Sequence, residues 1–433
     1  MKKLTLCMAC CLAITLNSTY AQSNNNKNSN FLRDYKAPDF KQKRFDIGLR
    51  LNGGGGSFAS STVGRFQENS DFRFLQFSNS ANYQGNLSAS LFTDIRFSKA
   101  SANDVEFKSF SMNYSAGLNT NNRFFFKNEW FIGLHNRGVV SYGSATESDV
   151  SNSSLNLSMI PAMSIGNGRM EPVSYARTAM DIEKSLAKGN RLGVEYDEGQ
   201  LKTIADELAQ INNVRFYDFR LRRIEQFEAL DRLMREVGGV SDFDMAYFSY
   251  LSDAYLYAQS FTRFSGFRSE IGIANRTQLI FQNPGDELYQ TYNLMAYANV
   301  IYDLPKSYAV QHTFEAGVIS GMQFDEDNGI ATSTFPTWVT GDYRLGLFPT
   351  TRTNLNLGVR GGVVYDQKIE ATSSLYANGS IYLSPQFRLS FNASARLGGQ
   401  YDSHAFGYLI PSPVNSFKGF SFSGGLSLNY AIF

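Results

Sequence analysis

Polar and apolar residues alternate in about fourteen short segments of this chain, and the alternation is interrupted once, near the middle. In the segment 387–397, for example, every second residue is apolar, and the residues between them are Arg, Ser and Asn. A period of two places apolar side chains on one face of a strand and polar side chains on the other. Repeated along a whole chain, this pattern predicts an all-β transmembrane fold, an antiparallel outer-membrane β-barrel of about 14 strands.

The N-terminus supports this interpretation. Residues 1–21 have a basic start, a short apolar core and a small-residue cleavage site, as in a secretory signal peptide. The three cysteines, Cys7, Cys10 and Cys11, all lie in that segment, so the mature chain is expected to have none. Acylation of Cys10 or Cys11, as in a lipoprotein, is the alternative. Residues 22–43 are then predicted to form a flexible periplasmic leader.

The alternating segments divide into two groups. Residues 44–168 are predicted to form barrel strands 1–6, and residues 262–433 strands 7–14. Polar stretches at 53–64, 98–104 and 141–152 are expected to be outer loops, and 119–122 a periplasmic turn. An even strand number with this alternation of loop lengths places both chain termini in the periplasm.

Between these groups, residues 169–261 change in both charge and periodicity. Over 170–240, 24 of 71 residues are charged, against 18% of the whole chain. Apolar residues fall at helical spacing, and Asp197 with Gln200 forms a capping-box pattern. Ser241 is expected to cap a last helix. The segment is therefore predicted to be an α-helical insertion between strands 6 and 7, either hanging in the periplasm or folded into the lumen.

The insertion carries a group of arginines: Arg215, Arg220, Arg222, Arg223, Arg232 and Arg235. They form either an ordinary solvated face or a docking surface for a periplasmic protein or for acidic lumen residues. The sequences Gly168–Pro172, Arg215–Ile224 and Glu228–Asp231 resemble an insertion found in uncharacterised Bacteroidota-type outer-membrane barrels. That resemblance implies a fold and a location but no activity, and it carries over no site residues.

Composition leaves little room for catalysis or for nucleic-acid binding. The formal net charge is +1, which offers no argument for nucleic-acid binding. The three histidines, His135, His312 and His404, share no metal-ligand spacing, and no cofactor is expected. A hydrolytic arrangement of His135 with Glu129 and Ser141 can be drawn, but serines are abundant throughout. The chain is predicted not to be an enzyme.

Strand parity places many charges on the predicted inner face. The basic residues are Arg50, Arg96, Lys127, Arg137, Arg268, Arg276, Arg344, Arg360, Arg388 and Arg396, and the acidic residues are Asp46, Asp94, Glu129, Glu270, Glu315 and Asp342. A charge facing lipid at mid-membrane would cost roughly 2–4 kcal/mol, which favours inward placement. These charges either pair across the lumen and rigidify a plugged barrel, or line a passage for anionic or polar solutes.

Two functions follow. The first is a porin-like transport barrel for small polar or anionic solutes, with the helical insertion as plug or docking element. The second is a non-conducting binding or assembly barrel whose helices recruit a periplasmic protein. In both cases the expected location is the outer membrane of a Gram-negative bacterium. The other expected partners are outer-membrane lipid, lipopolysaccharide and the barrel-insertion machinery.

Overall fold

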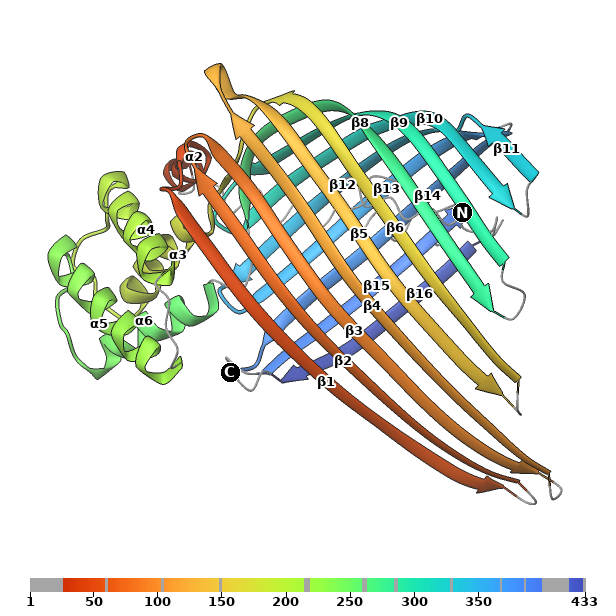
Figure 1. Ribbon diagram of the computed structural model, residues 1–433. Coiled ribbons are helices and arrows are strands. Elements are labelled where there is room, and N and C mark those ends of the chain that lie inside the picture. The colour runs from red at the N-terminus through yellow and green to blue at the C-terminus, as the bar shows by residue number, and fades with distance from the viewer. Residues whose placement is uncertain are drawn as a thin grey trace, which may run out of the picture.

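A computed structural model describes residues 26–58, 61–102, 105–147, 150–213, 219–258, 263–283, 287–327, 330–366, 368–384, 387–398 and 420–430. Its main feature is one antiparallel sheet of 16 strands, which curls into a barrel-like wall with a group of helices at one end (Figure 1). The expected signal peptide, residues 1–21, lies outside the described residues.

The strands follow one another in the sheet as they do in the chain. The first group is β1 (Phe40–Phe58), β2 (Ser61–Ser80), β3 (Tyr83–Ala102), β4 (Val105–Phe125), β5 (Trp130–Glu147) and β6 (Val150–Asn167). The second group is β8 (Phe264–Asn283), β9 (Glu287–Pro305), β10 (Val310–Asp327), β12 (Thr337–Thr350), β13 (Thr353–Asp366), β14 (Lys368–Tyr382), β15 (Phe387–Gly398) and β16 (Phe420–Tyr430).

The predicted strand order is confirmed, and the count differs slightly. Fourteen strands form the continuous path, and two short ones, β7 (Met170–Pro172) and β11 (Ile330–Thr334), pair beside it with β8 and β10. Within the described part of the chain, no ladder joins β16 to β1, so the sheet is curved but not closed.

Several predicted loops are wrong because the hairpins continue through them. Residues 53–58 pair with 61–66, and the stretches at 98–102 and 141–147 also lie within paired strands. The expected turn at 119–122 is inside β4, and the chain turns later, at a 3-10 helix, Lys127–Glu129. Gly, Ser and Asn have low strand propensity, but each pairing satisfies backbone donors and acceptors, and this outweighs the local preference. At the end far from the helices, the first strands extend beyond the rest of the sheet (Figure 1).

The described residues of the insertion between β6 and β8 form four helices, α3 (Ser174–Lys188), α4 (Glu198–Asn213), α5 (Phe219–Val237) and α6 (Met245–Ala258). Their apolar faces form one buried core, which includes Ile182, Leu208, Met234 and Leu251. No helix in the described residues is both long enough and apolar enough to cross a bilayer.

The helix caps illustrate local sequence control. Asp197 Oδ1 accepts a hydrogen bond from the Gln200 backbone N–H at 2.8 Å, and Gln200 Oε1 accepts one from the Asp197 N–H at 3.0 Å. This reciprocal pair is the predicted capping box. The predicted cap at Ser241 is wrong: Asp244 caps α6, accepting a hydrogen bond from the Tyr247 N–H at 2.9 Å. Asp244 directly precedes the first helical residue, which places its carboxylate within reach of that N–H.

The leader is not wholly flexible, in contrast to the prediction. Asn26–Asp34 forms helix α2, and Phe31, Leu32 and Tyr35 are buried in the core of the helical insertion. These three apolar and aromatic residues follow a polar run, and their burial supplies the free energy that orders the segment. The leader is therefore part of the helical body at the end of the sheet.

We expect Asp197→Ala to weaken the start of α4 by about 1 kcal/mol, because it removes one half of the capping box. Amide hydrogen exchange in the first turn of α4 should then be roughly fivefold faster. Asp197→Asn, which keeps an acceptor at the cap, is the matched control. Equal exchange in all three proteins would show that the capping box does not stabilise the helix.

Candidate functional site

The two faces of the sheet have opposite chemistry, and the distribution is the reverse of that in a water-soluble sheet. On one face, large apolar side chains are exposed: Leu91, Phe110, Leu118, Ile132, Leu134, Val140, Met163, Ile165, Ile271, Ile273, Leu294, Val300, Phe314, Val318, Val339, Val359 and Leu375. On the other, polar side chains are buried: Asn79, Gln84, Asp94, Arg123, His135, Ser164, Arg268, Glu270, Asn293, Asn299, Asp303, Thr313 and Ser380. We call these the outer face and the inner face.

Ion pairs across the inner face show that it is concave. Arg123 on β4 donates to both carboxylate oxygens of Glu270 on β8, at 3.3 Å each, although β5 and β6 lie between these strands. Both side chains are almost fully buried, with 5% and 0% exposure. A buried pair with two hydrogen bonds loses stability when one partner is removed, because the other charge remains buried.

A second polar group lies further round the inner face. Asp342 on β12 accepts a hydrogen bond from Arg360 on β13 at 2.7 Å and another from the Tyr376 hydroxyl on β14 at 2.9 Å. On β3, Arg96 and Asp94 form an ion pair of 2.6 Å within one strand. Part of the inner-face charge is therefore neutralised locally.

The strand register shows where the predicted lumen charges lie. Arg96, Arg137, Arg276, Arg344, Arg360, Arg388, Arg396, Glu270 and Asp342 lie on the inner face. Position 50 pairs with Asn69 on the same face, but the Arg50 side chain lies outside the described ones. The prediction that Lys127 and Glu129 face the lumen from a strand is wrong. The chain turns later than predicted, so both residues lie in the 3-10 helix, where Glu129 has a φ of 61°.

A cavity of about 250 Å³ lies inside the sheet near the helical end. Its walls come from β2, β3 and β4 on one side and from β8, β9, β10 and β12 on the other. Charged residues of both signs line it: Arg123, Arg268, Arg344, Asp303 and Glu315. Sequence parity had singled out Arg344 among the main lumen candidates but not Asp303, which lies at the end of its strand.

The helical insertion crosses this end of the sheet through α3. Tyr175 on α3 contacts Phe40 of β1, with ring centroids 5.7 Å apart. Arg177 on the same helix donates to the Thr350 carbonyl of β12 at 3.3 Å and lies over the Phe348 ring. Strands β1 and β12 are far apart in the sheet order, so α3 joins opposite walls.

Arg263, just before β8, fixes the insertion to a strand turn. Its guanidinium, in a residue that is 1% exposed, donates to the Tyr308 carbonyl at 2.6 Å, to the Ser307 carbonyl at 3.2 Å and to Gln311 Oε1 at 2.8 Å. It also lies 4.7 Å from the centroid of the Phe348 ring. A planar group with five donors suits this cluster of acceptors, and lysine could not replace it.

Two further contacts hold the insertion. Arg169 donates to the Ser80 and Ala81 carbonyls of the β2–β3 turn at 2.8 and 3.0 Å. Arg352 forms an ion pair with Asp253 of α6. The sequence analysis assigned no role to Arg169, Arg263 or Arg352. The positions of Arg169 and Arg263, at the two ends of the interruption, were the available signal.

The predicted docking arginines lie elsewhere. Arg215 is outside the described residues, and so are the side chains of Arg220 and Arg222. Arg223, Arg232 and Arg235 are exposed on α5, where Arg235 pairs with Asp231 at 2.9 Å. A docking role for this surface stays a prediction.

A buried charge cluster lies beneath α3. Asp181 is 1% exposed, with Arg177 Nε 3.6 Å from its carboxylate, and both its oxygens lack a hydrogen bond within the described structure. Burial raises the pKa of Asp181 to about 7, although Arg177, Lys184 and Arg263 favour the carboxylate. Burial also lowers the pKa of Lys184, whose ammonium lies 3.3 Å from the centroid of the Tyr308 ring.

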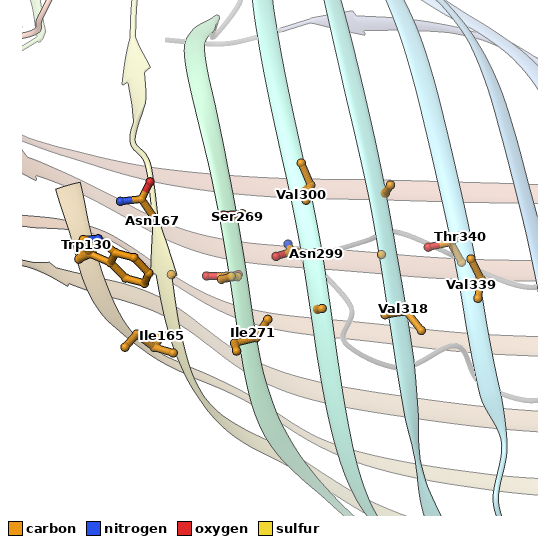
Figure 2. Close-up of a pocket in the computed structure, with 15 residues that line it drawn as sticks. Trp130, Ile165, Asn167, Ser269, Ile271, Asn299, Val300, Val318, Val339 and Thr340 are labelled. Carbon is orange, nitrogen blue, oxygen red and sulfur yellow. The ribbon is translucent and has the colours of Figure 1, made fainter. Parts of the chain in front are cut away.

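The outer face carries a shallow apolar groove of about 490 Å³. Figure 2 shows the apolar residues that line it from successive strands: Trp130, Ile165, Ile271, Val300, Val318 and Val339. Two small residues, Ala298 on β9 and Ala316 on β10, also line the groove and lower its floor. The exposed surface of the groove is mostly apolar, so the groove suits a hydrocarbon environment.

His135 lies on the inner face with Ser164, as part of the same buried network. Its Nε2 is 3.1 Å from Ser164 Oγ and 3.8 Å from Glu270 Oε2, while Nδ1 has no partner among the described residues. A hydrolase triad needs the carboxylate on the other ring nitrogen. The predicted partners are not in place, since Glu129 lies in the turn. In the described part of the chain, no three His, Cys, Asp or Glu side chains could together hold a metal ion.

Comparison with protein-family models and with curated protein sequences gave no match. Among solved structures, the translocator domain of autotransporter NalP from Neisseria meningitidis aligns with a TM-score of 0.27 and 8% identity, over 97% of this chain and 98% of that chain. The alcaligin outer-membrane receptor FauA from Bordetella pertussis aligns with a TM-score of 0.31 and 7% identity, over 92% of this chain and 60% of that chain. CdiB from Acinetobacter baumannii aligns with a TM-score of 0.30 and 8% identity, over 90% of this chain and 59% of that chain. Likenesses of this strength transfer no activity.

We expect the packing of α3 to weaken as pH rises from about 4 to 7. The pKa of Asp181 is raised by burial to about 7, so its protonated form stabilises the folded cluster and ionisation removes that contribution. The effect is at most roughly 4 kcal/mol. Asp181→Asn should abolish this pH dependence. The measurement is amide hydrogen exchange of α3 in the parent protein and in Asp181→Asn at each pH. If the two proteins changed in parallel with pH, Asp181 would not be the group responsible.

Proposed function

We propose that this chain is an outer-membrane β-barrel that conducts small polar solutes, with the helical insertion as its plug. The observation that carries the proposal is the reversed distribution of side chains, with apolar residues exposed on the outer face and charged residues buried on the inner face. An exposed apolar belt of this extent is stable only if hydrocarbon covers it.

The antiparallel ladder fits the same environment. A bilayer offers no water to backbone N–H and C=O groups, so a spanning sheet must satisfy them between strands. The continuous pairing from β1 to β16 does this for all but the two edge strands. The signal-peptide pattern of residues 1–21 supports export, and we propose the outer membrane of a Gram-negative bacterium as the location.

Transport is favoured by the inner face, and a plug is favoured by α3. The inner face offers charged and hydrogen-bonding groups from most strands, which suit a polar solute. At the helical end, however, α3 joins β1 to β12, and charged side chains of the inner face surround a cavity of about 250 Å³. Passage then requires the insertion to move away from the strand turns. We further propose that this end faces the periplasm.

The second candidate is a binding barrel in which the insertion recruits a partner. It is favoured by exposed apolar side chains on the insertion, Val194, Ile224 and Met245, with exposures of 72%, 56% and 84%. Ile224 lies beside Arg223 on α5, so an acidic and apolar surface would complement it. This candidate predicts no conductance under any condition.

The location can be tested with one pair of substitutions. Ile273 is 58% exposed on the outer face, so Ile273→Arg would change stability by less than about 0.5 kcal/mol if water covered that face. In a bilayer we expect a loss of about 2–4 kcal/mol. Ser90→Arg adds the same side chain to the inner face and should fold normally. The measurement is the folded fraction of each variant in lipid vesicles as a function of urea concentration. Equal unfolding midpoints for Ile273→Arg and Ser90→Arg would contradict a membrane-embedded sheet.

The plug can be tested by tying the insertion to the sheet. Asp253 and Arg352 contact each other across that boundary, and all cysteines of the chain lie in its first eleven residues. In the mature Asp253→Cys/Arg352→Cys double variant, a short bismaleimide should reduce single-channel conductance at least tenfold. The Lys202→Cys/Asp206→Cys variant, linked within α4, should keep its conductance.

Three outcomes separate the candidates. Loss of conductance only in the tied variant supports the plug. Conductance that survives tying shows that the insertion need not move. Silence in every protein, linked or not, rejects transport and leaves the binding barrel.

A further inference from the structure

The cavity inside the sheet contains an arginine that the ion pairs described above do not use. Arg268 of β8 is 9% exposed and lines the cavity, and its Nε has no hydrogen-bond partner within the described residues. Its neighbour Arg123 is occupied by Glu270 through two hydrogen bonds. A buried N–H donor without an acceptor is costly, because it has lost its hydrogen bond to water and has no other hydrogen bond in its place.

The same wall holds an acceptor in the same situation, two strands away, because Arg268 and Glu315 flank Ile301 of β9. Glu315 of β10 lines the cavity, and its buried Oε1 has no hydrogen-bond partner. Asp303 of β9, which also lines the cavity, accepts a hydrogen bond from Thr313. On the β12 side, Arg344 reaches the cavity beside Glu315. The cavity therefore presents a guanidinium N–H and a carboxylate oxygen, on different strands, that lack hydrogen-bond partners within the described residues.

The signs and the size together restrict the ligand. A simple anion would satisfy Arg268 but would lie close to the carboxylates of Glu315 and Asp303. A simple cation would face the reverse problem with Arg268 and Arg344. A volume of about 250 Å³ holds a molecule of amino-acid size and excludes a polymer. Amide side chains, Asn86 and Asn121, add neutral hydrogen-bonding groups to the wall.

We propose that this cavity is a binding site for a small zwitterion, such as a free amino acid, bound between Arg268 and Glu315. The ligand carboxylate accepts hydrogen bonds from Arg268, with Arg344 nearby, and the ligand ammonium donates to Glu315. The site rests on the proposed transport function for access only, because the ligand must enter the barrel from the end opposite the helices.

The test is a titration of the full chain in detergent micelles with L-glutamine, followed by calorimetry. Two derivatives each remove one charge: N-acetyl-L-glutamine lacks the ammonium, and L-glutaminamide lacks the carboxylate. Loss of one charge-assisted hydrogen bond should weaken binding about tenfold or more. We expect L-glutamine to bind and both derivatives to bind at least tenfold more weakly.

Two variants assign the ends of the ligand. Arg268→Gln should weaken L-glutamine about tenfold and leave L-glutaminamide unchanged, because that derivative has no carboxylate to lose. Glu315→Gln should weaken L-glutamine and leave N-acetyl-L-glutamine unchanged. Arg396→Gln, on the inner face but outside the cavity wall, is the control and should bind like the parent protein.

Each outcome decides. Equal binding of L-glutamine and N-acetyl-L-glutamine would show an anion site, and equal binding of L-glutamine and L-glutaminamide a cation site; either overturns the proposal. No heat with any of the three would show that the cavity holds only water. Binding of L-glutamine without any conductance would support the binding site and reject the transport function. The two proposals can therefore be rejected independently.

Discussion

Backbone pairing between neighbouring strands is the interaction on which the rest of this structure depends. Each strand of the continuous path from β2 to β15 pairs on both sides, so nearly every N–H and C=O of the sheet is satisfied within it. Because the pairing alternates side chains between two faces, it also separates the chain into an apolar outer surface and a polar inner one. The long hairpins show how strong this constraint is, since they continue through the Gly-rich run at 53–56.

The inner face and the helical insertion depend on each other. The charges of the inner face would be costly in an open apolar environment, and they are satisfied by pairs such as Arg123 with Glu270 that reach across the curve of the sheet. At the helical end, the arginines become structural: Arg263 and Arg177 bind carbonyls of strand turns through guanidinium groups that are almost completely buried. These buried contacts hold the insertion firmly against the strand turns, and the inner face of the sheet beside it is polar.

Much of the fold could be predicted because its signals are local. Alternation identified the strands and their order, and the helical period and capping residues identified the insertion. Boundaries were less predictable, as at Lys127 and Glu129, because the chain turns at 127–129 and not at 119–122, which changes the residues that belong to a strand. Arg123 of β4 and Asp303 of β9 line one cavity only because their strands, which are not paired, face each other across the curve of the sheet, and no local pattern records this.

By itself, the sequence determined which residues alternate, where the alternation stops and which side of each strand is polar, since these follow from a period of two. Only the tertiary structure decided that α2 joins the helical body, that α3 crosses the end of the sheet, and that Arg268 and Glu315 share one cavity. The physical reason is that such contacts join residues far apart in the chain. Their formation depends on the curvature of the whole sheet, which is a property of all its strands together.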